Sequence, residues 1–297
     1  MPAVTEERVP VARLRAGAPI EGVFACVRKD RLTAKSGSAY LAVELRDRTG
    51  SIAGRAFRDA DFLAGRFERG DLVRVSGRVE RFRDELQVEL RDIARVDDAG
   101  VDPAEFLPVA YRDLDELDGF LEHLAREVHD PALSRLLDSF MSDEGFRVAM
   151  RRTPCTRAGH HAYLGGLLEH TVAVATLAAE TCILHPRLDS DLLGAAAILH
   201  DIGKTREFRL GAEIGLSEEG RLLGHVAIGQ QMVAARIATV GSVPESRSLA
   251  LLHCIAAHHG AESLPGRRFG SAEALALYRL NALDASVKGA LEHGLPG

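Results

Sequence analysis

The spacing of apolar residues changes near residue 100, and this change divides the chain into two parts that must fold differently. Before it, five segments alternate between apolar and polar residues, as strands with one buried face do; they are residues 22–28, 40–46, 51–57, 72–82 and 85–94. After about residue 105 the apolar residues recur every three or four positions, which is typical of helices. A chain of 297 residues is long enough for two such domains.

Five short strands joined by tight turns predict a small closed barrel. The OB-fold is the commonest barrel of this kind, and an SH3-like barrel is the alternative. An acidic segment with Gly100 and Pro103 marks the boundary, and long helical stretches follow at 163–184, 190–203, 222–239, 246–258 and 272–292. The sequence therefore predicts a multidomain protein with an all-β OB-fold barrel at residues 10–97, a linker at 98–108 and an all-α domain at 109–297.

Composition limits where the protein works and what it binds. We expect no membrane association, because no apolar run reaches the length of a membrane span and the N-terminus lacks a signal-peptide pattern. The four cysteines are scattered without a Cys-x-x-Cys motif, which fits a reducing compartment and predicts a cytoplasmic location. The first 100 residues hold 19 Lys and Arg against 17 Asp and Glu, whereas the remainder holds 18 against 26. The acidic second part suits a cation site.

All twelve histidines lie after residue 122, and several of them stand with acids at the ends or faces of successive helical stretches. Imidazole and carboxylate are the ligands that many divalent metals prefer, and a hydrolytic site needs several of them to converge. The predicted ligands are His170, His200, Asp201, His225, His258 and His259. One or two ions fit this number of ligands.

The pair His200-Asp201 stands out by its context, because it ends the very apolar helical stretch 192–199. A buried His and Asp are costly unless they are paired or bind a metal. The pair His129-Asp130 lies in a polar connection before Pro131, and we expect it to be structural. We assign catalytic roles to Asp201, to His225 and to Lys204, whose charge lies beside the pair.

Longer strings carry a resemblance to a known family: HHAYLGGLLEHT at 160–171, LHDIGK at 199–204, LLGHV at 222–226 and HHG at 258–260. The order His, His-Asp, Asp is the signature of the HD-domain metal-dependent phosphohydrolases, and these strings resemble the YhaM-type 3′–5′ exoribonucleases. The resemblance implies an N-terminal OB-fold followed by an HD domain. It also implies hydrolysis of single-stranded RNA, with DNA as a further substrate, using Mn²⁺ first and Mg²⁺, Co²⁺, Fe²⁺ or Ni²⁺ as alternatives.

One position departs from the family pattern, in which the last metal ligand is an aspartate. The matching stretch reads LYRLNALDA at 277–285, so Asn281 stands where that aspartate is expected. The amide oxygen of Asn281 can still bind a metal but brings no charge, and metal affinity should fall. Asp284 lies one turn further on and either replaces the missing ligand or supports the site; we favour a supporting role.

Other residues near the motifs are candidates for contact with the substrate. Arg267 and Arg268 would neutralise phosphate charge, and the alternative is a solvated loop. His160 and His161 precede the helix of His170 in a turn flanked by glycine, where they either meet the substrate or cap the helix.

The alternation in the barrel predicts a nucleic-acid-binding face. If Leu41, Val43 and Leu45 point inward, the residues that face outward on the first three strands include Phe24, Arg28, Tyr40, Arg55 and Phe57. Aromatic and arginine side chains on an OB-fold surface suit single-stranded RNA or DNA, because each stacked base contributes ~1–3 kcal/mol. The alternative is that this face packs on the helical domain.

Three functions follow from these patterns. The leading hypothesis is a divalent-metal-dependent 3′–5′ exonuclease that binds a single strand with its barrel. The second is a phosphohydrolase of small nucleotides, in which the barrel serves oligomerisation; the sequence leaves a homo-oligomer open. The third is a nucleic-acid-binding protein whose HD site is weakened by Asn281.

Overall fold

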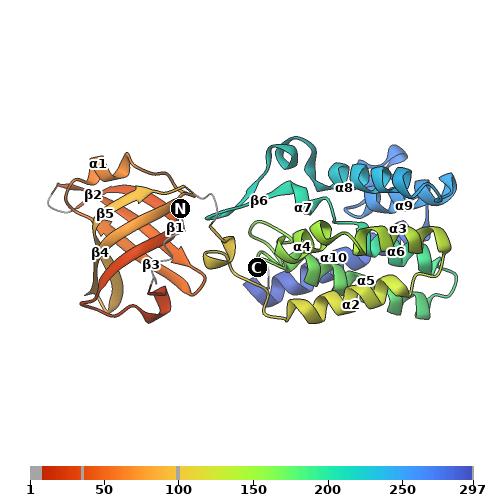
Figure 1. Ribbon diagram of the computed structural model, residues 1–297, viewed down its shortest axis with the longest axis horizontal. Coiled ribbons are helices and arrows are strands. Elements are labelled where there is room, and N and C mark those ends of the chain that lie inside the picture. The colour runs from red at the N-terminus through yellow and green to blue at the C-terminus, as the bar shows by residue number, and fades with distance from the viewer. Residues whose placement is uncertain (1–8, 35–36, 98–100, 296–297) are drawn as a thin grey trace. The chain divides into compact units, whose positions relative to one another are not determined.

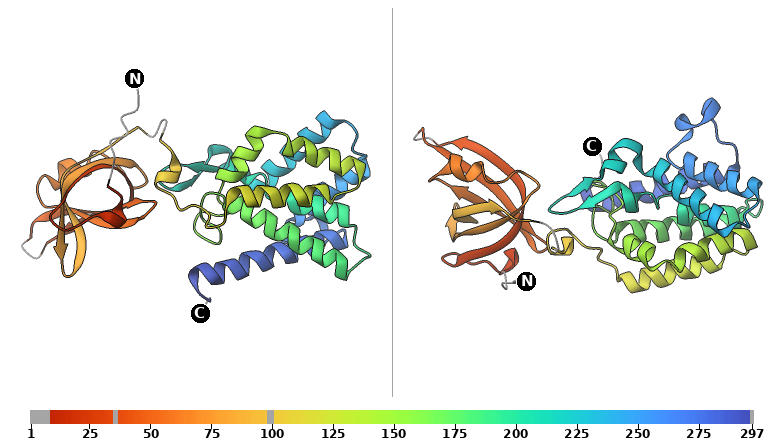
Figure 2. Two further views of the ribbon diagram at one scale, coloured as in Figure 1. Left: turned by 60° about the horizontal axis from the view of Figure 1, so that its bottom comes forward. Right: turned by 45° about the horizontal axis from the view of Figure 1, so that its top comes forward.

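The computed structural model of the protein describes residues 9–34, 37–97 and 101–295. The chain divides into two compact units, the first made of Met1–Pro108 and Leu210–Gly215, the second of Val109–Arg209 and Leu216–Gly297. Figures 1 and 2 show a β-barrel in the first unit and a bundle of helices in the second. The predicted fold class is confirmed. Residues 98–100 of the predicted linker and 296–297 of the predicted second domain lie outside the described residues.

The barrel consists of the five predicted strands, and neighbouring strands in it are antiparallel except for one parallel pair. They are β1 (Pro19–Thr33), β2 (Ala39–Asp47), β3 (Gly50–Ala56), β4 (Leu72–Phe82) and β5 (Glu85–Arg95). The barrel closes in the order β1-β2-β3-β5-β4, and β3 pairs with β5 in parallel. The short helix α1 (Ala60–Ala64) lies in the crossover between β3 and β4. Arg83 and Asp84 form the tight β4–β5 turn with positive φ angles, as the sequence predicts.

The side chains of β1 are divided between two apolar clusters, and this corrects one sequence prediction. Phe24 is fully buried in the barrel interior, rather than on the outer surface. Val23 and Ala25, the neighbours of Phe24 that the same alternation would place inside, belong to a smaller cluster with Phe106 and Ala212. Both faces of β1 are therefore apolar, and alternation alone cannot say which face is interior.

Within its described residues the helical unit contains nine α-helices, and all of them except the short α7 contribute to one apolar core. They are α2 (Leu114–Arg126), α3 (Pro131–Met141), α4 (Glu144–Arg152), α5 (Gly166–Leu184), α6 (Ser190–Leu199), α7 (Lys204–Glu207), α8 (Glu218–Val240), α9 (Glu245–Ala257) and α10 (Ala272–His293). Aspartates begin four of them by accepting hydrogen bonds from the free backbone N–H groups of the first turn: Asp113, Asp130, Asp143 and Asp189. Asp130 of the first His-Asp pair thus has the structural role that we expected.

A two-stranded hairpin interrupts the helices between α7 and α8, where the sequence prediction has no strand. Its strands are β6 (Phe208–Leu210) and β7 (Ile214–Leu216), and its tip belongs to the first unit. There the Arg46 guanidinium donates a hydrogen bond of 2.9 Å to the carbonyl of Ala212. Three-residue strands are too short to show an alternating pattern in the sequence.

Helix α5 is the central helix of the second unit. Among the described helices it alone is long and apolar enough, by length and composition, to cross a membrane. Half of its apolar window is buried among other helices, and it packs on α2, α4, α6 and α10. Glu169 and His170 are buried on it. These contacts are those of a core helix, and α5 brings His170 into the interior.

Candidate metal centre

The predicted ligands converge from four parts of the helical unit onto one cluster, which is buried except at His225 and His259. His170 comes from α5, His200 and Asp201 follow α6, His225 lies on α8, and His258 ends α9. The cluster lies at a cavity of about 500 Å³. Ligand atoms of Asp201, His225, His258 and His259 lie within 4.8 Å of one another, and so do those of His170, His200 and Asp201.

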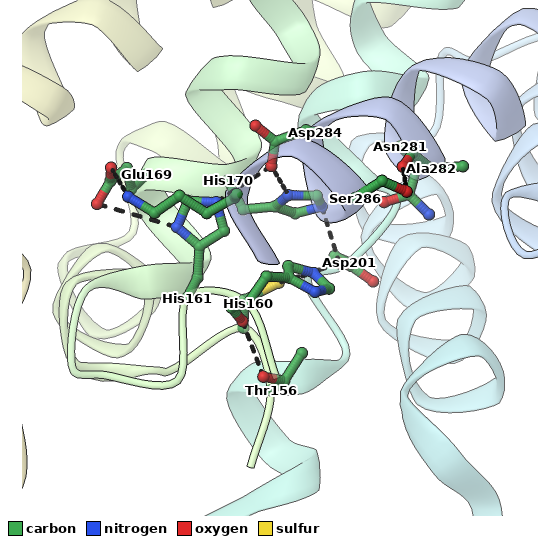
Figure 3. A network of polar contacts seen from close by, with 12 residues as sticks. Thr156, His160, His161, Glu169, His170, Asp201, Asn281, Ala282, Asp284 and Ser286 are labelled. Atoms are coloured by element: carbon green, nitrogen blue, oxygen red, sulfur yellow. Dashed lines mark hydrogen bonds and ion pairs between the residues drawn. The ribbon is translucent and has the colours of Figure 1, made fainter. Parts of the chain in front are cut away.

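Asp201 is the centre of this cluster, and its two oxygens face different partners. Oδ2 lies 3.5 Å from His170 Nε2 and 3.3 Å from His200 Nε2. Oδ1 lies 3.4 Å from His225 Nε2 and 3.3 Å from His258 Nε2. Figure 3 shows His170 on α5 directed at Asp201, with Asp284 of α10 on the other side of the imidazole ring.

The Nδ1 atoms of four histidines are held by acceptors outside the cluster. His200 Nδ1 and His258 Nδ1 donate to the carbonyls of Ala197 (2.8 Å) and Ile255 (2.6 Å). His170 Nδ1 lies 2.6 Å from Asp284, and His225 Nδ1 lies 3.1 Å from Glu207. With the proton on Nδ1, each neutral imidazole directs the lone pair of Nε2 inward, as a metal-ligating histidine does.

This arrangement brings lone pairs together that need a cation between them. Nε2 of His170 and Nε2 of His200 are 3.2 Å apart, although both Nδ1 atoms already carry the protons. Asp201 Oδ1 and His258 Nε2 are buried without a hydrogen-bond partner among the described residues. Buried acceptors of this kind are costly unless a proton or a metal satisfies them. The donor set therefore fits a divalent metal, as the sequence predicts.

The protonation states also favour metal binding. Burial raises the pKa of Asp201, but Lys204 and the surrounding histidines outweigh it and hold that pKa well below its usual range. Burial lowers the pKa of His170 and His258, and it lowers the pKa of His259 to about 3. The aspartate is thus ionised and these histidines are neutral near pH 7, which is the state in which they bind metals.

Lys204 lies beside the site, as the sequence predicts, and it also forms an ion pair with Asp201. Its ammonium donates to Asp201 Oδ2 (2.6 Å) and to the Cys155 thiol (3.4 Å), and its side chain is buried. Burial lowers the pKa of Lys204, but the attraction of Asp201 is stronger, so the pKa is raised and the ammonium stays charged. Lys204 also lines the cavity, where its charge is available to an anion.

The residues Asn281 and Asp284 take different places on α10. The amide Nδ2 of Asn281 donates to the carbonyl of His258 (3.1 Å), and Asn281 lines the cavity. Asp284 accepts from His170 Nδ1 and lies 3.1 Å from His161 Nε2. This is the supporting geometry that we favoured for Asp284. Burial raises its pKa, but its bonds to the two histidines outweigh burial and lower it.

The remaining predicted contacts with the substrate lie in different places. His160 lines the cavity, and its pKa is lowered to about 4 by burial and by His170. His161 is 1% exposed and hydrogen-bonded to Tyr163 and Asp284. Of its two predicted roles, contact with the substrate is therefore wrong, because the side chain is buried behind His170. Arg267 and Arg268 are exposed and are not among the residues that line the cavity.

Two features of the site escaped the sequence analysis. Glu207 accepts hydrogen bonds from the backbone N–H (2.9 Å) and Nδ1 of His225, which fixes that imidazole. Its position in the same short helix as Lys204 was the available signal. Thr156 and Arg157 line the cavity, and Arg157 places a positive charge there. The loop before His160-His161 carries both residues, but no pattern distinguishes it from an ordinary connection.

The remaining predicted contact residues belong to the barrel, and all of them except Phe24 come together on one surface. The rings of Tyr40 and Phe57 stack with their centroids 5.3 Å apart, and Phe57 is 53% exposed. The Arg55 guanidinium lies over Tyr40, 5.6 Å from the ring centroid, and donates to its hydroxyl (3.2 Å). Arg28 and Arg55 line a shallow groove of about 280 Å³ across β1, β2 and β3. We call Arg28, Tyr40, Arg55 and Phe57 the barrel face.

Comparison with known families agrees with both parts of the fold. The HD domain matches residues 167–286, and the OB-fold nucleic acid binding domain matches residues 23–96. The first span contains all the predicted metal ligands, and the second contains the barrel face. The chain is therefore an OB-fold and HD-domain protein.

Its relatives share both domains over nearly the whole chain. The 3′-5′ exoribonuclease YhaM of Shouchella clausii is 28% identical over 95% of this chain and 89% of that protein. YhaM of Bacillus subtilis is 29% identical over 89% of this chain and 85% of that protein. The second OB-fold domain of replication protein A from Methanococcus maripaludis covers 30% of this chain and 94% of that chain, with 21% identity and a TM-score of 0.25. The YhaM relatives confirm the family resemblance.

Proposed function

We propose that this protein is a divalent-metal-dependent 3′–5′ exonuclease that hydrolyses the phosphodiester bonds of single-stranded RNA. The observation that carries the proposal is the buried Asp201, surrounded by inward-facing Nε2 atoms at the cavity. The printed name of the YhaM relatives, 3′-5′ exoribonuclease, supports the direction and the substrate. DNA is a further substrate of the proposal, because the barrel face carries no group that requires a 2′-hydroxyl.

A bound divalent ion supplies Lewis-acid chemistry, since it polarises a phosphoryl oxygen and makes a water molecule easier to deprotonate. The ligands would be His170, His200, Asp201, His225, His258 and His259, with Mn²⁺ as the first candidate. Asn281 contributes at most its neutral amide oxygen. These residues have the donor chemistry for Mn²⁺, Mg²⁺, Co²⁺, Fe²⁺ or Ni²⁺.

The other residues of the cavity orient these ligands and receive the phosphate. Glu207 and Asp284 hold the imidazoles of His225 and His170. Lys204 keeps Asp201 ionised and in place. Arg157 and Lys204 line the same cavity and offer positive charge to a phosphate oxygen.

The barrel face would bind the strand that is being degraded. Stacked Tyr40 and Phe57 offer an exposed aromatic surface for bases, and Arg28 and Arg55 offer charge for the backbone. This surface distinguishes the exonuclease from a phosphohydrolase of small nucleotides, which has no use for a second binding surface on another domain.

A labelled-substrate assay tests the proposal. The protein is incubated with Mn²⁺ and with RNA labelled at its 5′ end, and separately with the matching DNA and with mononucleotides. We expect labelled RNA to shorten stepwise from the 3′ end and the reaction to stop with a chelator. Hydrolysis of mononucleotides alone, or binding of RNA without cleavage, would overturn the proposal.

We propose a cytoplasmic location, which the cysteines support. Cys26, Cys155, Cys182 and Cys254 are all free thiols, and three of them are buried. Free thiols are typical of a reducing compartment.

We further propose that two copies of the chain associate through α10. Its side chains Leu283, Val287 and Leu291 are 49%, 51% and 79% exposed and lie one turn apart on one face. An exposed apolar stripe of this kind favours a partner helix. We expect light scattering to give a molecular mass twice that of the chain. Leu291→Lys should reduce it to the mass of a single chain.

A further inference from the structure

The outward side chains of β1, β2 and β3 form two rows across the shallow groove of the barrel. The Cα partners are Arg28, Glu44 and Ala53 in one row, and Asp30, Ala42 and Arg55 in the next. All six residues line the groove, which has a volume of about 280 Å³. Sites for drug-sized ligands measure ~300–1,000 Å³, so the groove suits one base of a nucleic acid.

The floor of the groove is made of small side chains, and one end of it is closed. Ala42 and Ala53 are the alanines of the two rows, and they let a flat group approach the sheet. Arg46 follows on the same face of β2 and donates to the carbonyl of Ala212 (2.9 Å). Ala25, the partner of Arg46 on β1, is buried in the same apolar cluster as Ala212. A ligand in the groove therefore lies on the two alanines and ends short of Arg46.

Glu44 differs from the other charged side chains of the groove, because its carboxylate has no direct partner. Arg28 pairs with Asp30 (2.5 Å), and the guanidinium of Arg55 is held by two hydrogen bonds. Glu44 is half-buried and attracts Arg46 through space, but its carboxylate forms no hydrogen bond or ion pair within the described residues. A carboxylate only accepts hydrogen bonds, and it repels phosphate. Glu44 thus suits a ligand that brings N–H donors.

Among the four RNA bases, guanine offers the donors that match a carboxylate. Its Watson–Crick edge carries two neighbouring donors, N1–H and the 2-amino group, which can bind both oxygens of one carboxylate. Adenine and cytosine each place an acceptor nitrogen beside their amino group, and uracil has one N–H between two carbonyl oxygens. Proteins read these edges in single-stranded RNA, where the bases are unpaired.

The place of Glu44 fits a base next to the one that stacks on the aromatic rings. Tyr40 and Glu44 are four residues apart on β2, which is about 13 Å at ~3.3 Å per residue. Tyr40 and Phe57 therefore serve a different base from the one at Glu44. We propose that Glu44 makes the groove select guanine, by accepting hydrogen bonds from N1–H and the 2-amino group of the base. This inference rests on the proposed function, in which the barrel binds the strand.

Exchange of guanosine for inosine tests the inference, because inosine lacks only the 2-amino group. The full chain is titrated, with fluorescence anisotropy as the readout, with phosphorothioate-linked uridine strands that resist hydrolysis and carry one guanosine or one inosine. We expect the guanosine strand to bind about tenfold more tightly, which corresponds to ~1.4 kcal/mol and to one bidentate contact with a base. Equal affinities, or tighter binding of the inosine strand, would overturn the inference.

Substitution of Glu44 separates its contact from the rest of the groove. Glu44→Ala should bind the guanosine and inosine strands equally. Glu44→Gln keeps the shape but has a single acceptor oxygen, so it should also lower the preference. Glu21→Ala is the matched control and should keep the preference, since it removes an exposed carboxylate of β1 outside the groove. A preference for guanosine that survives both changes of Glu44 would overturn the inference.

This inference and the proposed function fail in different ways. Cleavage of RNA without a preference for guanosine would reject the inference and leave the proposed function standing. A preference for guanosine without cleavage of RNA in the presence of Mn²⁺ would instead reject the proposed function.

Discussion

The dipeptide His-Asp occurs twice in the helical unit, and its two copies have different roles. At 129–130 the Asp130 carboxylate accepts hydrogen bonds from the first turn of α3 and pairs with Arg247. At 200–201 the pair follows an apolar helix into the interior, where Asp201 meets four imidazoles and Lys204. The residues are the same, and their surroundings differ. A metal site thus requires several buried helix ends that converge, and no dipeptide alone defines it.

The largest effect is expected from Asp201→Asn. The variant loses the carboxylate that faces four of the imidazoles, so Mn²⁺ binding should disappear and RNA cleavage should fall by about 1,000-fold or more, roughly 4 kcal/mol. Binding of RNA to the barrel face should persist, and a filter-binding assay beside a cleavage assay measures both. Because the variant also leaves the Lys204 ammonium buried without its partner, Asp201→Asn with Lys204→Met is the control for folding. Cleavage at the wild-type rate would show that the centre is not at Asp201.

A smaller effect is expected where the support of a ligand is removed. Glu207→Gln replaces the carboxylate that holds the His225 imidazole, and such changes typically cost about 10- to 100-fold in metal affinity. Glu219→Gln is the matched control, because the half-buried Glu219 pairs with the exposed Arg206 at the surface, and such pairs contribute little. Calorimetry with Mn²⁺ measures both. Equal affinities in the two variants would mean that Glu207 does not orient His225.

The barrel face permits the same kind of matched comparison. Phe57→Ala removes a ring that stacks on Tyr40, and it should weaken RNA binding by ~1–3 kcal/mol, the contribution of one stacked base. Phe82→Ala is the control, because Phe82 is similarly exposed (51%) but lies at the end of β4, where its ring faces Arg83 and not Tyr40. The expected result is a higher KM with an unchanged kcat for Phe57→Ala alone. Identical KM values would place the RNA elsewhere.

The smallest effect is expected at the other His-Asp pair. Burial raises the pKa of Asp130, but its helix-cap hydrogen bonds and Arg247 outweigh burial and lower it below the model-peptide value of 3.8. The Asp130 carboxyl thus has a lower pKa in the folded than in the unfolded protein, so the carboxylate stabilises the fold at every pH above its unfolded pKa. This stabilisation is lost as the pH falls through the pKa of the folded protein. Asp130→Asn keeps the cap and loses the charge, so it should cost about 0.5 kcal/mol at pH 7.

Urea unfolding of Asp130→Asn and of the wild type, both in the presence of a chelator, checks this prediction. The difference between their free energies of unfolding should shrink as the pH falls below 3.8, because the wild-type carboxyl then becomes protonated in both states. Metal binding should be unchanged. A loss of bound Mn²⁺ in Asp130→Asn would remove the distinction between the two pairs.

The sequence predicted the order of domains, the five strands and the long helices because each has a regular apolar period. It predicted which histidines and which aspartate come together in the cluster, because these residues lie within recognisable strings. It could not place Phe24, since both faces of β1 are apolar and the choice between them depends on Phe106 and Ala212, which are remote in sequence. Glu207 and His161 were missed or misplaced for a similar reason, because their roles depend on contacts between separate elements.

The most direct test of the account is to locate the metal. Crystals of the protein grown with Mn²⁺ would be measured at the manganese absorption edge, and an anomalous difference map would be calculated. The account predicts a peak in contact with Asp201 Oδ1 and His258 Nε2, two buried atoms of the cluster that have no hydrogen-bond partner among the described residues. A peak outside the cluster, or none at saturating Mn²⁺, would contradict it.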